Sequence, residues 1–418
     1  MKKLLAVLAT LIAVAGLAVS VAGCSATPAK ITLAQNKPEI DAALKAYAAD
    51  WSAANKVAVT IKSVGGSSNI DLSTQLKADF AAGDMPDIFA IDGIQSYNQW
   101  KDIIADLSDS KWVANTSVAF KVDGKVYGFP VSVEGWGLAY NADLLSKAGI
   151  DPATLNNYAA YKAAFEKLNG MKKQLGIDSV VSMAAGPDMG WVTADHDFNA
   201  LLSNGLAYGD KSVTNALLAG TVDPQRLAQY ADWVELMFKY ADKKVLTTGN
   251  YDSQVGAFAN QKAVFLHQGN WVDPNMKQAN ATFKMGFAPY GSLSTATDGI
   301  FVSAPSFYVV NTKSKNIKAA KKFLEDMAAT DRGHTYIVKD AGMIPAFSNI
   351  NLQPDGELSK SVQAWASAGK IYSWNQYDFT NDFRSKTLAP IYNQFANGSI
   401  DKAKFIALMT SAFESLKK

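Results

Sequence analysis

VAVTIKSVGGSSNIDLSTQLKADFAAGDMPDIFAID, residues 57–92, is the stretch of sequence that decides the fold. Apolar side chains at every second position over 57–61 predict a strand. The glycine- and serine-rich segment 65–68 predicts a loop, and apolar residues at every fourth position predict a helix over 72–83. Residues 87–92 contain an unbroken apolar run, which is typical of a strand buried on both faces. The apolar residues of the predicted helix are Leu72, Leu76 and Phe80.

The residues before this stretch extend the same alternation of strands and helices. Residues 31–33 predict a strand, and an apolar stripe at helical spacing runs from Pro38 to Asn55. Strand, helix, strand, helix, strand in this order predicts an α/β fold, with a parallel sheet that carries helices on its faces. Further helices are predicted at 156–173, 224–241, 317–327 and 400–416.

The N-terminus has the pattern of a lipoprotein export signal. Lys2 and Lys3 precede an uncharged apolar run over 4–22, and small residues stand directly before Cys24, the only cysteine. We expect cleavage after residue 23, lipid attachment at Cys24, and a tether over 24–29 that holds the folded part outside the cytoplasm at the cell membrane. The alternative is an uncleaved anchor helix, because nineteen uncharged residues nearly span about 30 Å of hydrocarbon.

Composition limits the partners of the chain. It has 40 basic and 38 acidic residues, and removing residues 1–23 takes away Lys2 and Lys3, which leaves 38 of each. This neutrality argues against nucleic acid as a partner. The roughly 395 residues that remain are too many for one hydrophobic core, so we expect two domains. With three histidines, a dedicated metal carrier is not expected, and we expect a monomer without a cofactor.

Six blocks of sequence together indicate a family. In their order along the chain they resemble the extracellular solute-binding proteins of ABC sugar importers, the group typified by maltose-binding protein. The resemblance implies that the chain binds a sugar, performs no catalysis and delivers its ligand to an ABC permease. The blocks are PDI at 86–88, DGKVYGFP at 123–130, WGLAYN at 136–141, GAFANQKAV at 256–264 with GNW at 269–271, AAKKFL at 319–324, and GMIPA at 342–346.

The resemblance also implies two α/β lobes of a periplasmic-binding-protein-like fold, between which the chain crosses three times. The expected N-terminal lobe is 30–132 plus 290–340, and the expected C-terminal lobe is 133–289 plus 341–418. Closure of the lobes on an oligosaccharide would then be what the transporter recognises. The crossings are expected near 131–134, 288–291 and 339–342.

Sugars offer apolar ring faces to aromatic side chains and hydroxyl groups to fixed polar groups. The resemblance implies that Trp271 stacks on a sugar ring, with Gln268 and Asn270 beside it. Asp92 follows a buried strand, where ligands of open sheets bind, although it can also cap the next helix. Glu134 matches a ligand-binding glutamate of the family at the first crossing. Its alternative role is a structural ion pair at a hinge.

The other predicted ligand-binding residues lie in loops or at segment ends. The alternative role of Trp191 is to pack inward at the start of a helix, and the alternative role of Asn69 is to cap a helix. The family more often buries an apolar residue at the position of Trp136. Where relatives carry an aromatic residue after the first strand, this chain has Gln35 and Asn36. The remaining predicted site residues are Ser68, Asn69, Trp136, Asp188, Trp191, Trp374 and Asp378.

Three alternative functions would use other features of the sequence. A binder of a small cationic amine or peptide would use acids such as Asp92, Glu134 and Asp188. A glycoside hydrolase would need two carboxylates about 5 to 9 Å apart, and no motif assigns such roles. Asp195, His196 and Asp197 resemble metal ligands, but we expect them to open a helix, where acids favour the positive end.

Overall fold

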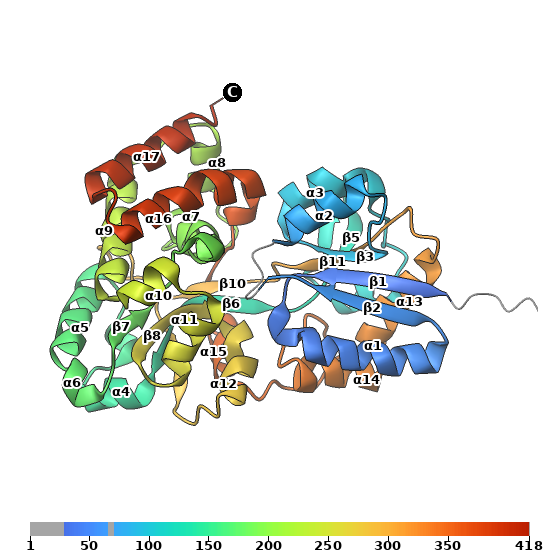
Figure 1. Ribbon diagram of the computed structural model, residues 1–418, viewed down its shortest axis with the longest axis horizontal. Coiled ribbons are helices and arrows are strands. Elements are labelled where there is room, and N and C mark those ends of the chain that lie inside the picture. The colour runs from blue at the N-terminus through green and yellow to red at the C-terminus, as the bar shows by residue number, and fades with distance from the viewer. Residues whose placement is uncertain (1–28, 66–70, 418) are drawn as a thin grey trace, which may run out of the picture.

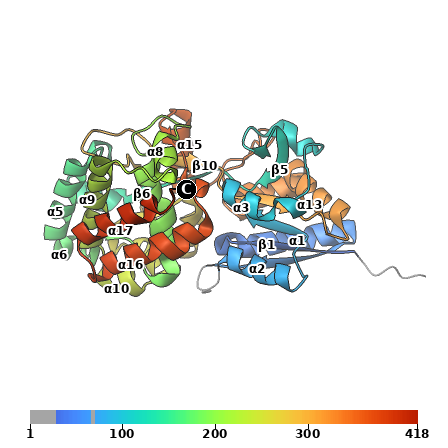
Figure 2. The same cartoon turned by 90° about the horizontal axis from the view of Figure 1, so that it is seen from above.

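The computed structural model describes residues 29–65 and 71–417, and it has two lobes (Figures 1 and 2). Each lobe has its own hydrophobic core. The expected two-lobed α/β fold is therefore confirmed. Within the described ranges, no helix is long and apolar enough to cross a bilayer. The export signal, Cys24, Ser68 and Asn69 lie outside the described residues.

The N-terminal lobe is built on a six-stranded sheet with the order β2-β1-β3-β11-β5-β4. β1 pairs in parallel with β2 and β3, as the sequence predicts, whereas β11 is antiparallel to both of its neighbours. The strands are β1 (Lys30–Gln35), β2 (Ala58–Ser63), β3 (Ile88–Ile91), β4 (Phe120–Val122), β5 (Lys125–Pro130) and β11 (Phe307–Val310).

Helices cover both faces of this sheet, with α2 and α3 on one side and α1 and α14 on the other (Figure 1). The α1 stripe predicted from the sequence is buried, and Trp51 donates through Nε1 to Asp326 of α13 at 2.7 Å. α2 begins where the Asp71 carboxylate accepts the backbone N–H of Thr74 at 2.8 Å. The helices of this lobe are α1 (Asp41–Asn55), α2 (Leu72–Ala81), α3 (Gly93–Trp100), α13 (Ile317–Ala329) and α14 (Asp331–Thr335).

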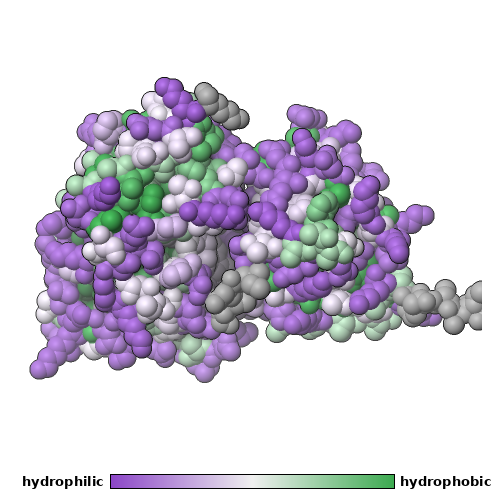
Figure 3. Space-filling view, turned by 45° about the horizontal axis from the view of Figure 1, so that its top comes forward, coloured by the Kyte–Doolittle hydropathy of each residue, from purple (hydrophilic) through white to green (hydrophobic). Residues whose placement is uncertain are grey.

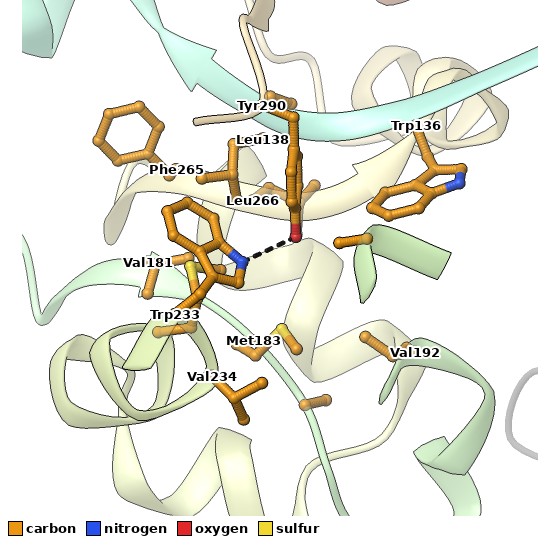
Figure 4. Close-up of a cluster of buried hydrophobic side chains, with 14 of the residues drawn as sticks. Trp136, Leu138, Val181, Met183, Val192, Trp233, Val234, Phe265, Leu266 and Tyr290 are labelled. Atoms are coloured by element: carbon orange, nitrogen blue, oxygen red, sulfur yellow. Dashed lines mark hydrogen bonds between the residues drawn. The ribbon is translucent and has the colours of Figure 1, made fainter. Parts of the chain in front are cut away.

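The C-terminal lobe has a second sheet, with the order β12-β10-β6-β8-β7 and with β9 also paired to β6. β6 is its central strand and is antiparallel to β8, β9 and β10. The core that packs against it contains aliphatic and aromatic side chains, and Trp233 donates to the hydroxyl of Tyr290 at 3.0 Å (Figure 4). The strands are β6 (Glu134–Asn141), β7 (Ser179–Ser182), β8 (Ala263–Gly269), β9 (Met285–Ala288), β10 (Ile300–Ser303) and β12 (Ile371–Tyr372).

Most of the helices belong to this second lobe, with α16 and α17 forming an outer layer (Figure 1). The long α9 spans Pro224–Tyr240 and starts at an Asp223 cap, close to the predicted 224–241. The others are α4 (Ala142–Lys147), α5 (Tyr158–Gly170), α6 (Lys172–Leu175), α7 (Phe198–Ser203), α8 (Ser212–Leu218), α10 (Lys243–Thr248), α11 (Tyr251–Ala259), α12 (Asp273–Gln278), α15 (Glu357–Ser367), α16 (Ala389–Asn397) and α17 (Lys402–Glu414).

The chain crosses between the lobes at three places, and two of them differ from the expected residues. The first passage, at 131–133, joins β5 to β6. The second lies at 304–306 and not near 288–291, because β9 and β10 both pair with β6 and the loop between them stays within one lobe. The third follows Leu352, which packs against the first core, and precedes Leu358, which is buried in the second. The expected boundaries at 290 and 340 are therefore too early.

Candidate functional site

A cavity of about 250 Å³ lies between the lobes, and both lobes and the second passage contribute to its walls. On the N-terminal side part of its lining comes from the carboxyl ends of three parallel strands, with Asn36 and Lys37 after β1, Gly65 after β2, and Asp92 after β3. Residues of α2 and α3 also line this side. This is where ligands of open α/β sheets bind. In the space-filling view the two lobes meet along a groove (Figure 3).

The C-terminal lobe contributes an aromatic wall. The rings of Trp271, Trp191 and Trp374 lie 4.9, 5.4 and 5.5 Å from the imidazole of His196, measured between centroids. All four residues line the cavity, together with Tyr251 and Tyr377. Burial lowers the pKa of His196 well below its ordinary value, so the imidazole is neutral near pH 7. The three indoles and this imidazole therefore form an uncharged aromatic part of the wall.

A chain of buried amides fixes the ring of Trp271. Its indole Nε1 donates to Oε1 of Gln268 at 2.9 Å, and Nε2 of Gln268 donates to Oε1 of Gln254 at 2.8 Å. The ring lies directly over Gly269, where an added Cβ would come within 2.0 Å of a ring carbon. Gln268 is itself fully buried, so it positions the indole and does not line the cavity.

Two π-helical turns bring a charged pair to the cavity wall. Asp195 lies in the turn Val192–Asp197, and Arg384 lies in the turn Phe383–Leu388. Their side chains form an ion pair, and the guanidinium carbon of Arg384 lies 5.0 Å from the ring centre of Tyr377. The segment 195–197 thus lies inside a helical stretch that is already formed at Gly190 and runs on into α7, so the expectation that these residues open a helix is wrong. The described part of the chain contains no cluster of three or more His, Cys, Asp or Glu side chains placed to hold a metal ion.

An ion pair joins the lobes at the base of the cavity. Nζ of Lys37 lies 2.5 Å from Oε1 of Glu134, and the same oxygen accepts from Oγ of Ser132 at 2.7 Å. Burial by itself lowers the pKa of Lys37, but the carboxylates of Glu134 and Glu39 outweigh it and raise the pKa. Lys37 is therefore protonated. Glu134 forms the alternative ion pair and lines the cavity at the same time.

Asp92 precedes α3, but its side chain makes no capping hydrogen bond. Its Oδ2 instead accepts from Nδ2 of Asn36 at 3.3 Å. Burial raises the pKa of Asp92 to about 6, although Lys37 opposes this shift. Burial also raises the pKa of Glu39 to about 7. Such carboxyl groups accept hydrogen bonds from hydroxyl groups when ionised, and donate one as well when protonated.

Several buried polar atoms at the cavity have no hydrogen-bond partner among the described residues. A buried polar atom without a partner costs about 1–3 kcal/mol, so most find one in the protein, in water or in a ligand. Donors and acceptors are mixed in this set, which suits a ligand that can both give and accept hydrogen bonds. The atoms are Oδ1 of Asn36, Nδ1 of His196, Oγ of Ser306 and Nε1 of Trp374.

Five predicted site residues do not line the cavity. Gln268 holds Trp271, as described above. Trp136 is fully buried and stacks on Phe301 with ring centroids 4.2 Å apart, because its side of β6 faces the core. Asn270 is buried, and its Oδ1 accepts the backbone N–H of Gly135 at 2.9 Å.

The last two are acids. Asp188 is exposed in the short helix Pro187–Met189 and is not part of the lining. Asp378 pairs with Lys211 at 2.7 Å, and its backbone carbonyl accepts from Nε2 of Gln95 of the other lobe at 3.1 Å. Asp378 therefore contributes to the contact between the two lobes and not to the cavity wall.

Sequence reasoning missed several lining residues. Lys37 and Glu39 follow β1 just as Asp92 follows β3, so the same rule of strand ends would have found them. Tyr377 lies three residues after the predicted Trp374 in the same loop. Arg384 carries no sequence signal, because it reaches the cavity from a π-helical turn.

The sequence pattern of one family, described as bacterial extracellular solute-binding protein, matches residues 34–332. The chain belongs to this family. Its members are binding proteins and not enzymes. The resemblance to the extracellular solute-binding proteins is therefore confirmed. The expectation of a location outside the cytoplasm is confirmed with it.

Two relatives illustrate the similarity. The melibiose/raffinose/stachyose-binding protein MelE of Bacillus subtilis strain 168 is 26% identical over 271 residues, which are 62% of this chain and 61% of MelE. The chain thus aligns with less than two thirds of that relative. The multiple sugar-binding protein of Streptococcus mutans is 24% identical over 384 residues, covering 87% of this chain and 86% of the relative.

Solved structures share the fold of this solute-binding protein. A sugar transporter from Bacillus licheniformis, solved in complex with stachyose, superposes with a TM-score of 0.74 at 20% identity, over 93% of this chain and all of that one. A chitin oligosaccharide binding protein superposes with a TM-score of 0.74 at 18% identity, over 93% and 98% of the two chains. Both likenesses extend across the two lobes.

Gly269→Ala is expected to destabilise the protein by about 1–3 kcal/mol, because the new methyl group would overlap the ring of Trp271 and force it to move. Thermal unfolding and tryptophan fluorescence measure the two effects. The matched control is Gly256→Ala in α11, where an added Cβ would meet no atom nearer than 4.0 Å apart from its chain neighbours and the backbone of its own helix. An unchanged melting temperature and emission spectrum in Gly269→Ala would contradict the assigned packing.

Glu39→Gln is expected to raise the melting temperature at pH 8 and to change it little at pH 4.5. Burial raises the pKa of Glu39 to about 7, because it favours the neutral form in the folded protein. The contribution of Glu39 to the free energy of unfolding is therefore fully present below about pH 4.5 and is lost as the pH rises through 7. Scanning calorimetry at both pH values measures this, with Glu414→Gln on the exposed face of α17 as the control. An equal shift at both pH values would contradict the prediction.

Proposed function

We propose that this protein captures an oligosaccharide in the cavity between its lobes and delivers it to the permease of an ABC importer. One observation carries the proposal: the cavity opposes indole faces on one lobe to polar groups at strand ends on the other. A sugar ring presents an apolar face and a rim of hydroxyl groups, so it satisfies both walls at once.

The proposed stacking surface consists of Trp191, Trp271 and Trp374. The proposed hydroxyl partners are Asn36 and Asp92 on the N-terminal lobe, with Glu134 at the first passage and Asn36 Oδ1 available as an acceptor. Neither wall alone encloses a ring, so bound sugar favours the closed arrangement of the lobes. A micromolar site needs about 8 kcal/mol, which stacked rings and hydrogen bonds can supply without covalent chemistry.

Similar proteins support this class of ligand. The relatives are named for binding melibiose, raffinose and stachyose, for multiple sugars, and for maltooligosaccharides as an ABC transporter solute-binding lipoprotein of Streptococcus pneumoniae. The proposal includes no catalysis, because the role of the cavity is to hold and release its ligand unchanged. We also propose that the protein acts as a monomer.

A small cationic amine or peptide is the second candidate, and the charge of the cavity favours it. Lys37 and Arg384 are the two cations of the described lining, and each is already paired with a carboxylate. Three further acids, Glu39, Asp71 and Asp92, line the same cavity. Raised pKa values reduce the charge of Glu39 and Asp92, which is why we prefer a neutral, hydroxyl-rich ligand.

A thermal-shift screen of sugars, amines and peptides separates these two candidates. A ligand that binds only the folded protein raises its melting temperature. We expect oligosaccharides to raise it and amines to leave it unchanged. A shift with amines alone would replace the proposed function by the second candidate.

Trp271→Ala is expected to weaken sugar binding at least about tenfold, or about 1.4 kcal/mol, because it removes the ring against which the sugar stacks. Isothermal titration calorimetry with a sugar from the screen measures the affinity. The matched control is Trp365→Ala: this indole donates to the backbone oxygen of Phe287 at 3.0 Å and does not line the cavity. Equal affinities of the Trp271 variant and the unmodified protein would refute the assignment.

We further propose that Cys24 is lipid-modified and tethers the protein to the outer side of the cell membrane. The basic start, the apolar run and the small residues before the single cysteine support this. Cys24→Ser is expected to release the protein from the membrane fraction while its sugar affinity stays the same. Retention of Cys24→Ser in that fraction would instead favour an uncleaved anchor helix.

A further inference from the structure

One face of α2 continues from the cavity to the surface. Leu72, Ser73 and Leu76 line the cavity, and Phe80 follows Leu76 by four residues on the same face. Four residues of helix advance by roughly 6 Å. Phe80 therefore lies one helical turn beyond the last α2 residue of the cavity wall, in the direction that leads out of it.

Phe80 is exposed although its neighbours on this face are buried. It is 54% exposed, and only two other large apolar residues in the described chain, Tyr208 and Leu218, are classed as exposed. Its ring lies 5.6 Å from that of Trp100, and Trp100 is 6% exposed and lines the cavity. A single exposed apolar residue is ordinary. Here, however, its ring contacts that of Trp100, which belongs to the cavity wall.

The cavity is small for an oligosaccharide. Its volume of about 250 Å³ lies below the roughly 300–1,000 Å³ that is usual for ligand pockets. At its base the Lys37–Glu134 ion pair closes it. On the side of α2, Lys77 pairs with Asp382 of the other lobe at 3.3 Å, which keeps the helix against the cavity. A longer sugar must therefore leave part of its length outside.

We propose that Phe80, supported by Trp100, forms an outer subsite on which a sugar unit beyond the enclosed part of the ligand stacks. The subsite deepens the proposed function and rests on it: it assigns the ligand to oligosaccharides that are longer than the cavity. The apolar face of a pyranose ring matches the exposed phenyl ring. Phe80 then determines length preference, whereas the enclosed residues determine binding itself.

The test compares sugars of increasing length by isothermal titration calorimetry. The probes are melibiose, raffinose and stachyose as one series, and maltose, maltotriose and maltotetraose as another. Phe80→Ala is expected to weaken binding of the longest bound sugar about fivefold to tenfold and to leave the shortest within about twofold. Phe80→Trp, which keeps a ring, is expected to retain the affinity for the longest sugar. Leu218→Ala is the control, because this exposed residue of α8 does not line the cavity.

Each outcome decides the proposal. A loss in Phe80→Ala that is equal at every length, or absent at every length, overturns the outer subsite while the proposed function stands. Absence of binding of every probe to the unmodified protein overturns both. Because Phe80 is largely exposed, its removal is expected to leave the melting temperature within a few degrees, and this measurement separates loss of contact from loss of fold.

Discussion

The ion pair between Lys37 and Glu134 is the contact on which the cavity depends. It joins the end of β1 in one lobe to the start of β6 in the other at 2.5 Å, beside the first passage of the chain. Taking two charges out of water costs several kcal/mol per ion, so such a pair adds little net stability. It links the two lobes directly, and the cavity lining contains both of its residues together with Asp92 from one lobe and Trp271 from the other. The ligand then adds the contacts that neither lobe can make alone.

The aromatic wall depends on the buried interior of the C-terminal lobe. Trp271 is held by the amide chain through Gln268 to Gln254 and lies over Gly269, where no side chain intervenes. His196 lies among the indoles and is neutral because it is buried. Residues that never touch a ligand therefore set the position of the rings that do. Preorganised rings lose little conformational freedom when a ligand binds, which leaves more of the contact energy for affinity.

The sequence was sufficient to predict the fold class and part of the candidate site, and its errors have physical causes. Strand and helix spacing predicted the parallel pairing of β1 with β2 and β3, and the rule of strand ends located Asp92. The antiparallel strands of both sheets were not predicted. Trp136 was a wrong site prediction because both faces of β6 are covered, so alternation along that strand could not show that its ring faces the core. Arg384 enters through a π-helical turn, which breaks the 3.6-residue period. The second crossing depended on which strands pair with β6, and pairing is not visible in one sequence.

The central claim is that one sugar bridges the two lobes between Trp271 and Asp92. A crystal structure of the protein with a bound oligosaccharide tests it most directly. The account predicts a pyranose ring parallel to the indole of Trp271, with hydroxyl groups within hydrogen-bond distance of Asp92. Electron density for the sugar that contacts one lobe alone, or that lies away from both side chains, would contradict it.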